Sequence, residues 1–264
     1  QKVIERDRRQ AEFSMSWSKY RGFAVSEQRI AEGRRAVEQN RALLRQVEQR
    51  YDVSPRAIAG IWGMESGFGA VQGDYKVIEA LATLAWEGRR AKFFCAELMA
   101  ALKILDQGHI APARMLGSWA GAMGQPQFMP TSYLNMAADF DGDGKKDIWT
   151  NKGDVFASIA NYLSRSGWRG GESWGLQVVL PASFDPSQAG RDNKRKIADW
   201  ERAGVKPLEG PWGAPPDRLA AIVVPDPAEG EAFAVFQNFA AIRRYNPSDY
   251  YAAAVGLLGD RLGA

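Results

Sequence analysis

A predicted helix that places one carboxylate on an apolar face constrains this chain more than any other feature. Ser54 and Pro55 mark its start, because a serine side chain caps free N–H groups and proline fits the first helical turn. Four residues at helical spacing then share one face: Ile58, Ile61, Trp62 and Glu65. The glycine-rich segment 66–69 follows, and glycines typically end a helix. The pattern predicts a short helix that carries Glu65 beside apolar side chains.

Two effects should raise the pKa of Glu65. Apolar neighbours disfavour the charged carboxylate, and so does the negative end of the helix dipole. A glutamate that stays protonated near neutral pH is what a general acid requires. The alternative is that Glu65 extends into water at the helix end or pairs with an arginine.

The residue inventory excludes several kinds of chemistry. The chain has 264 residues with a single cysteine, Cys95, and a single histidine, His109. An internal disulfide, a cysteine-based metal site, Ser-His-Asp or Cys-His catalysis and multi-histidine zinc chemistry are therefore impossible within one chain. Acid–base work must fall to carboxylates, lysines or tyrosines. We expect Cys95, which lies in an apolar run, to be a small buried residue and His109 to be a loop residue without a special role.

Charge and aromatic content favour some partners over others. The net charge of +3 is small and scattered along the sequence, so nucleic acid is not an expected partner. An anionic polymer would suit this charge weakly. The nine tryptophans and eight tyrosines suggest a carbohydrate groove, because aromatic faces stack on sugar rings.

An acidic loop predicts a calcium site. Acidic residues at positions 1, 3 and 5, followed by glycine at position 6, match the start of an EF-hand loop, although Thr150 stands where the usual glutamate would be. The candidate ligands are Asp139, Asp141, Asp143, the carbonyl of Lys145 and Asp154. Neighbouring carboxylates would repel one another without a cation. The alternatives are a metal-free turn cluster and, for Asp154, an N-cap of the next helix.

The remaining pattern predicts a mainly α, α+β protein. One long amphipathic helix is expected over residues 27–51, and short strands are expected at 174–181, 220–225 and 232–236. We expect four parts: N-terminal helices at 1–52, a helical core with an insertion and the calcium loop at 53–171, a small loop-rich subdomain with a few strands at 172–236, and C-terminal helices returning to the core at 237–264.

Several further motifs lie in a fixed order along the chain. Arg89 and Arg90 open a long apolar helix, where paired positive charges are unfavourable unless they face an acidic group. The segment 117–130 is rich in small residues, with polar Ser and Gln among Trp, Met and Phe, and small residues permit close approach of a backbone or a ligand.

Together these motifs resemble the lytic murein transglycosylase B family, bacterial cell-wall enzymes with a lysozyme-like core. The resemblance runs from about Val53 to Val255. It rests on Gly-Met-Glu-Ser-Gly-Phe-Gly at 63–69, Arg89-Arg90, Ser118-Trp-Ala-Gly-Ala-Met-Gly, Gln127-Phe-Met-Pro, the acidic loop at 139–154, Asn161-Tyr162 and Arg244-Tyr245-Asn246-Pro247.

The resemblance implies a role for each matching residue. Glu65 looks like the single catalytic acid and base, and Ser118 like the residue that contacts this glutamate and the N-acetyl group of the substrate. The groove residues around the reacting sugar would be Gln127, Tyr162, Tyr245 and Asn246. Arg89 and Arg90 would meet the acidic peptide stems, and the acidic loop would bind Ca²⁺. Family members often have Asn where Asp141 stands. No organic cofactor is implied.

The implied reaction fits a chain with one strong carboxylate candidate. Ordinary retaining glycosidases need two carboxylates about 5–5.5 Å apart. A lytic transglycosylase cleaves the bond between N-acetylmuramic acid (MurNAc) and N-acetylglucosamine (GlcNAc), with one glutamate acting as acid and then as base. The product is a 1,6-anhydro-MurNAc end.

Two other activities stay open: a muramidase that uses water, and a catalytically silent peptidoglycan-binding scaffold. A calcium sensor is a weaker alternative, because sensors usually pair two EF-hands. The resemblance implies peptidoglycan glycan strands as the partner, with other cell-wall enzymes as potential partners. It also implies a monomer in the periplasm of a Gram-negative bacterium, soluble or lipid-anchored in the native precursor.

Overall fold

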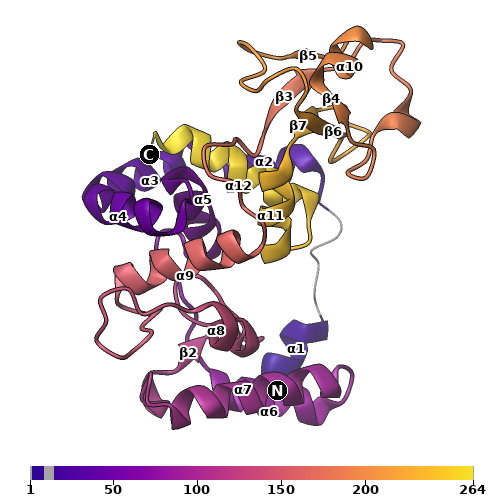
Figure 1. Cartoon of the computed structure of the whole chain (residues 1–264). Helices are drawn as coiled ribbons and strands as arrows, with labels where there is room; N and C mark the ends of the chain where they lie inside the picture. The colour runs from indigo at the N-terminus through magenta and orange to yellow at the C-terminus, as the bar shows by residue number, and fades with distance from the viewer. Residues whose placement is uncertain (1, 9–14, 264) are drawn as a thin grey trace.

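The computed structural model describes residues 2–8 and 15–263, and helices dominate them (Figure 1). The α-helices are α1 (Lys2–Arg8), α2 (Trp17–Ala24), α3 (Glu27–Gln39), α4 (Arg41–Tyr51), α5 (Pro55–Ser66), α6 (Val77–Glu87), α7 (Ala91–Asp106), α8 (Pro130–Met136), α9 (Lys152–Arg165), α10 (Ile197–Arg202), α11 (Gln237–Tyr245) and α12 (Asp249–Leu262). The predicted mainly helical fold with a small strand-containing part is confirmed.

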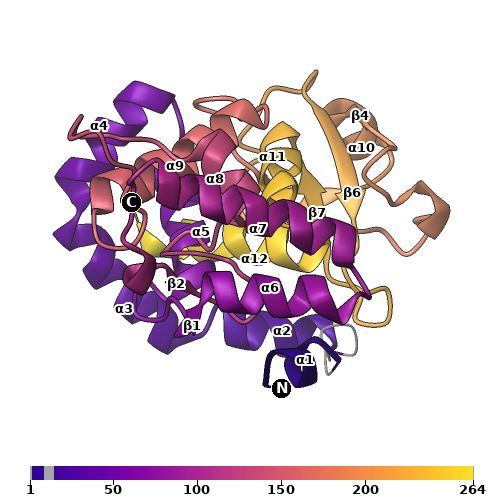
Figure 2. The ribbon, with the colours of Figure 1, turned by 90° about the horizontal axis from the view of Figure 1, so that it is seen from below.

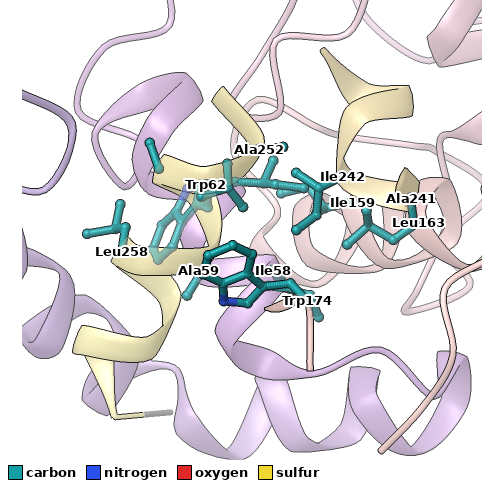
Figure 3. Packing of buried hydrophobic residues seen from close by; sticks show 14 of the residues in the cluster. Ile58, Ala59, Trp62, Ile159, Leu163, Trp174, Ala241, Ile242, Ala252 and Leu258 are labelled. Carbon is teal, nitrogen blue, oxygen red and sulfur yellow. The ribbon is translucent and has the colours of Figure 1, made fainter. Parts of the chain in front are cut away.

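Helix α5 is the centre of the largest apolar core. The Ser54 side chain accepts a hydrogen bond from the Arg56 N–H at 3.3 Å, and Pro55 is the first helical residue, as predicted. Nine of the twelve residues of α5 are buried, and Ile58 and Trp62 are fully buried. Figure 3 shows these two side chains packed with residues of α9, α11 and α12.

Helices α5 and α12 approach each other closely because glycines line the seam between them. A Cβ atom on Gly60 would lie 2.5 Å from the carbonyl oxygen of Val255, and one on Gly259 would lie 2.5 Å from that of Arg56. Any larger side chain at these positions would push the helices apart. The seam therefore fixes the distance of α12 from the end of α5 that carries Glu65.

Helices α6, α7 and α8 form a second group with its own apolar cluster, which includes Leu81, Phe94 and Tyr133 (Figure 2). A two-residue antiparallel pair, β1 (Tyr75–Lys76) and β2 (Leu116–Gly117), connects the segments on either side of the α6–α7 hairpin. Gly73 permits this crossing, since it has φ +86° and a Cβ there would lie 2.1 Å from the Gly117 carbonyl oxygen. The segment after α5 is thus held against the segment 116–130.

A five-stranded antiparallel sheet forms the third group, at the top of Figure 1. Its strands are β3 (Gly175–Val179), β4 (Arg195–Lys196), β5 (Lys206–Pro207), β6 (Leu219–Val223) and β7 (Ala232–Val235), in the order β4-β6-β7-β3-β5. Ile222 of β6 pairs with Ala234 of β7, which in turn pairs with Leu176 of β3. All of β7 is buried, because one face of the strand packs on the main core and the other on a cluster around Trp200.

Two sequence-based expectations are wrong. The helix predicted over residues 27–51 is two helices, because Asn40 leaves helical geometry at φ −116° and its side-chain amide donates to the Ala36 carbonyl at 2.7 Å. Cys95 is exposed on α7, because the buried face of that helix carries Phe94 and Glu97 instead.

The boundaries proposed between the four parts of the chain, at residues 53, 172 and 237, remain a prediction. Within the described residues, no helix combines the length and apolar character needed to span a membrane.

Candidate active site

Glu65 lies at the last turn of α5, where the helix ends in a left-handed glycine. Gly67 adopts φ 56° and ψ 47°, and its N–H donates to the Gly63 carbonyl, so the helix ends at Ser66. Glu65 is partly exposed, although Ile61 and Trp62 on the same face of α5 are buried. A group that must both stay protonated and touch a substrate requires this combination.

The phenol of Tyr251, on α12, donates a hydrogen bond of 2.5 Å to a carboxyl oxygen of Glu65. Tyr251 is only 4% exposed. Burial raises the pKa of Glu65 from 4.5 to about 7, and the Tyr251 hydrogen bond opposes that rise because it favours the charged carboxylate. The sequence predicted a raised pKa for Glu65, and the structure agrees, with burial as the main cause of the rise. At neutral pH the group can both give and accept a proton.

The loop 117–130 forms one side of the site. The Ser118 hydroxyl oxygen accepts the N–H groups of Ala120 and Ala122, at 3.3 and 3.0 Å, so this side chain fixes the turn of its own loop. The Gln127 amide donates to the carbonyls of Gln72 and Gly124, at 3.1 and 2.8 Å. Among the described residues, the hydrogen bond to Glu65 comes from Tyr251, and none joins Glu65 to Ser118.

Three aromatic rings form the next part of the site. The rings of Tyr162 and Tyr245 lie 4.7 Å apart, and each lies within 6 Å of Phe128, at 5.8 and 5.7 Å respectively. The Tyr162 hydroxyl donates to the Arg244 carbonyl and the Tyr245 hydroxyl to the Pro126 carbonyl, both at 2.6 Å. Burial raises the pKa of both phenols. With their hydroxyls engaged, these tyrosines can offer ring surface to a ligand.

Three predicted residues lie further out. Asn246 is exposed just beyond the end of α11. Arg89 and Arg90 are exposed at the turn between α6 and α7, and the Arg90 guanidinium lies 4.8 Å from the centre of the Phe94 ring. The structure therefore brings Tyr162 and Tyr245 together through their rings. Gln127 directly follows Pro126, whose carbonyl accepts the Tyr245 hydroxyl, while the two arginines lie at the turn between α6 and α7.

The other buried carboxylates have structural partners. Glu97 is 3% exposed and accepts both the N–H and the hydroxyl of Thr131, at 2.9 and 2.7 Å, which ties α7 to α8. Asp154 is fully buried and accepts the N–H groups of Phe140 and Asp147, both at 2.7 Å. Within the described part of the chain, Glu65 is thus the carboxylate that combines partial exposure with a strongly raised pKa near 7.

The acidic loop gathers three carboxylates. Asp139, Asp141 and Asp143 each place an oxygen so that all lie within 4.8 Å of one another. Asp139 also accepts the N–H groups of Gly142 and Gly144, at 2.7 and 2.9 Å, which winds the loop tightly. Hard carboxylate oxygens at this spacing fit Ca²⁺.

Two residues important to the site were missed from the sequence. Tyr251 follows Glu65 by 186 positions, and nothing in the spacing of its helix points to that partner. Gln125 is buried, accepts the Trp62 indole N–H at 2.8 Å and donates to the Trp149 carbonyl at 2.9 Å. The only sequence signal for Gln125 was its place in the small-residue segment.

Fold and site together define a mainly helical protein with one partly exposed carboxyl group, that of Glu65, whose pKa is raised to about 7. The model of the transglycosylase SLT domain family matches residues 1–260. Membrane-bound lytic murein transglycosylase B of Escherichia coli (strain K12) is 35% identical over 246 residues, which are 92% of this chain; the chain spans 66% of that relative's length. The chain belongs to the transglycosylase SLT domain family.

Solved structures with the same fold are also similar in sequence. SltB3 from Pseudomonas aeruginosa in complex with NAG-anhNAM-pentapeptide has a TM-score of 0.94 and 46% identity, covering 100% of this chain and 71% of that one. The Escherichia coli lytic transglycosylase Slt35 in complex with calcium has a TM-score of 0.85 and 33% identity, covering 99% of this chain and 82% of that one. The family resemblance and the lysozyme-like core expected from the sequence are confirmed.

Proposed function

We propose that this protein is a lytic transglycosylase that cleaves the MurNAc–β-1,4–GlcNAc bond of peptidoglycan and forms 1,6-anhydro-MurNAc ends. The observation that carries the proposal is the state of Glu65: partly exposed, hydrogen-bonded to Tyr251 and with a pKa of about 7. The lytic transglycosylases among the relatives, one of them bound to NAG-anhNAM-pentapeptide, support it.

In the first step, protonated Glu65 gives its proton to the glycosidic oxygen, and the bond between that oxygen and C1 of MurNAc breaks. The electron-deficient C1 is stabilised by the oxygen of the substrate's own N-acetyl group. The neutral Glu65 that the raised pKa favours is the form this step needs.

In the second step, the Glu65 carboxylate removes the proton of the MurNAc C6 hydroxyl, and that oxygen bonds to C1. The bond closes the 1,6-anhydro ring, and Glu65 is again protonated. No water is consumed, so no second carboxylate is needed to activate one. The Tyr251 hydrogen bond stabilises the carboxylate between the two steps.

The residues around Glu65 would hold the sugar. Tyr162 and Tyr245 would offer their rings, because their hydroxyls are engaged with backbone carbonyls. Ser118 and Gln127 would meet polar groups of the substrate from the loop 117–130. Asn246 would contact the reacting sugar, and Arg89 and Arg90 would meet acidic peptide stems from the α6–α7 turn.

The acidic loop would hold a structural Ca²⁺ through Asp139, Asp141, Asp143, the Lys145 carbonyl and Asp154. The carboxylate cluster and the calcium complex of Slt35 support this. Asp154 approaches the loop from α9, and each of its oxygens keeps a lone pair beyond the N–H group it accepts. We place the protein in the periplasm of a Gram-negative bacterium, since one relative is a membrane-bound murein enzyme of Escherichia coli.

Mass spectrometry of the soluble products from purified peptidoglycan sacculi tests the proposal. We expect muropeptides lighter by one water than their reducing-end forms. Glu65→Gln should lower the rate at least about 10²-fold, the usual contribution of a general acid, while sacculus binding is retained. Reducing-end products would indicate a muramidase. Binding without any product, by the wild-type protein, would indicate a scaffold.

A further inference from the structure

The hairpin 123–128 carries a buried amide, that of Gln125, which the mechanism above does not use. Met123 and Phe128 exchange two backbone hydrogen bonds, at 2.8 and 3.0 Å, and the four residues between them form the tip of the hairpin. Gln125 is only 5% exposed. Gln127, on the same tip, has φ +50°, a left-handed conformation that a residue other than glycine keeps only where its surroundings enforce it. The tip is therefore held in one shape.

Three hydrogen bonds attach Gln125 to two other parts of the chain. Its side-chain oxygen Oε1 accepts the Trp62 indole N–H of α5 at 2.8 Å, and its amide nitrogen Nε2 donates to the Trp149 carbonyl at 2.9 Å. Its backbone N–H donates to the Ile148 carbonyl at 2.9 Å. Ile148 and Trp149 are buried, on the segment that leads into α9. A side chain at this position must both accept and donate, because a buried partner left unpaired is unfavourable.

Gln125 contacts the chain on both sides of Glu65. Trp62 precedes Glu65 by three residues and shares its face of α5. Gly69 follows Glu65 by four residues, and a Cβ atom there would lie 2.5 Å from the Gln125 Oε1. The amide oxygen is thus packed against the helix before the acid and against the backbone of the turn after it. Movement of Gln125 would disturb both of these neighbours.

The same hairpin contacts the residues proposed to hold the sugar. The Pro126 carbonyl accepts the Tyr245 hydroxyl at 2.6 Å. The Phe128 ring lies 5.7 Å from the Tyr245 ring and 5.8 Å from the Tyr162 ring. The buried amide of Gln125 therefore connects the helix that carries the proposed acid to the hairpin that supports the proposed sugar-binding tyrosines.

We propose that Gln125 is a positioning residue that sets the separation between Glu65 and the sugar held by the hairpin. The inference rests on the proposed function and adds a residue that touches neither the substrate nor the reacting atoms. Proton transfer requires the acid within about 2.6–3.2 Å of the glycosidic oxygen, so a displacement of about 1 Å can lower the rate about 100-fold. Sugar affinity should change much less, because the hairpin keeps its contacts with Tyr245.

Two variants of Gln125, assayed at pH 5 on soluble glycan strands, test the proposal. Gln125→Met keeps the length of the side chain but cannot donate, so we expect kcat to fall about 10- to 100-fold while KM stays within about threefold of the wild-type value. In Gln125→Glu, burial keeps the carboxyl group protonated, and this group offers the same acceptor together with a hydroxyl donor. Gln125→Glu should therefore restore kcat to within about threefold of the wild type, a rescue that a general loss of packing would not show.

A second buried amide provides the matched control. Asn238, at the start of α11, accepts the Arg169 N–H at 2.7 Å and donates to the carbonyls of Arg169 and Glu172, at 2.9 and 2.8 Å. Asn238→Leu removes these buried hydrogen bonds without touching the hairpin. It should lower the melting temperature but leave kcat and KM unchanged when all the proteins are assayed below their melting temperatures.

A measurement without turnover separates this inference from the proposed activity. Hydrogen exchange of the Trp62 indole proton, followed by NMR at pH 5, should be faster in Gln125→Met than in the wild type and in Gln125→Glu. Absence of any product from the wild-type protein would contradict the proposed function, whatever the exchange rates show. With an active wild type, an unchanged kcat in Gln125→Met, equal losses in Gln125→Met and Gln125→Glu, or the same loss in Asn238→Leu would overturn the positioning role.

Discussion

Tyr251 acts on Glu65 through one hydrogen bond, so its removal isolates that contact. Tyr251→Phe removes a donor that favours the carboxylate, and the pKa of Glu65 should therefore rise above about 7. Wild-type kcat/KM should fall as pH rises through about 7, because the acid must be protonated. In the variant we expect this alkaline limb to shift upward by about 0.5–1 pH unit, measured from the pH profile of anhydro-product formation.

The neighbouring residue provides the control for this experiment. The Tyr250 hydroxyl bonds to Asp226 at 3.3 Å rather than to Glu65. Tyr250→Phe should keep the wild-type pH profile. A Tyr251→Phe profile that coincides with the wild type, or an equal shift in both variants, would contradict the assigned contact.

At the level of residues, sequence reasoning predicted the position and the raised pKa of Glu65 but not its hydrogen-bond partner. The position of Glu65 could be predicted because helical periodicity and the glycine stop are local signals. Tyr251 could not be predicted, since its proximity follows from the packing of two helices far apart in the chain. The hydrogen bonds that Ser118 makes within its own loop could not be predicted either, because a serine among small residues can bond to any of several nearby backbone groups.

At the level of elements, the glycine seam between α5 and α12 should control catalysis. Gly60→Ala places a Cβ 2.5 Å from the Val255 carbonyl oxygen, a backbone atom that cannot move without α12. We expect a loss of about 1–3 kcal/mol in stability, measured by thermal unfolding, as overpacking typically costs. We also expect a lower kcat, because Tyr251 moves away from Glu65.

A glycine without neighbours serves as the matched control. Gly22 is exposed in α2, and a Cβ there meets nothing within 4 Å. Gly22→Ala should stabilise the protein by up to about 1 kcal/mol through helix propensity and leave kcat unchanged. Equal melting temperatures for Gly60→Ala and the wild type would show that the seam tolerates a methyl group.

The acidic loop between α8 and α9 gives a second prediction at this scale. Asp143→Ala removes one of the three clustered carboxylates, so it should lower the melting temperature only in the presence of Ca²⁺. In the presence of a chelator the variant should equal or exceed the wild type, because repulsion within the loop falls. An equal loss under both conditions would argue for a metal-free turn cluster.

The presence of a helix was easier to predict than an interruption within it or the side of it that is buried. The amphipathic stripe over residues 27–51 runs through both α3 and α4, so periodicity alone did not reveal the break at Asn40. That break depends on one side-chain amide bonded to the Ala36 carbonyl. Cys95 lies beside buried Phe94 in an apolar run, and only the packing of α7 on α6 and α8 decides which of the two faces inward.

At the level of the whole molecule, Glu65 should make stability depend on pH. The folded state holds a proton up to about pH 7, whereas an unfolded glutamate releases it near 4.5. The unfolded state therefore binds fewer protons between these values, and the free energy of unfolding falls as pH rises through this window. Glu65→Gln, which resembles the protonated form, should be more stable than the wild type above pH 7 by about 1–3 kcal/mol, allowing for partial exposure.

Urea denaturation at pH 4.5 and pH 8 measures this difference. Glu201→Gln, at an exposed position of α10, should show the wild-type dependence on pH. A stability gap between Glu65→Gln and the wild type that stays constant from pH 4.5 to 8 would contradict a raised pKa at Glu65.

The assembly of the three apolar groups was only partly foreseeable. The short strands predicted at 174–181, 220–225 and 232–236 indicated the sheet. The order and pairing of its strands depend on long-range contacts such as those between β3 and β7. The pair of arginines bound to Asp249, which joins the sheet group to α11 and α12, has no local signature. Charge complementarity between distant segments appears only once the chain is folded.

The hydrogen bond between Tyr251 and Glu65 has a consequence for how the protein is made. It joins residues 186 positions apart, and its donor lies on the last helix of the described chain. A polypeptide still emerging from the ribosome, or still crossing a membrane, holds Glu65 without its tyrosine and without the glycine seam. The hydrogen bond that Glu65 accepts therefore forms only after α12 has been made and has docked on α5, so the proposed acid reaches its final environment only then.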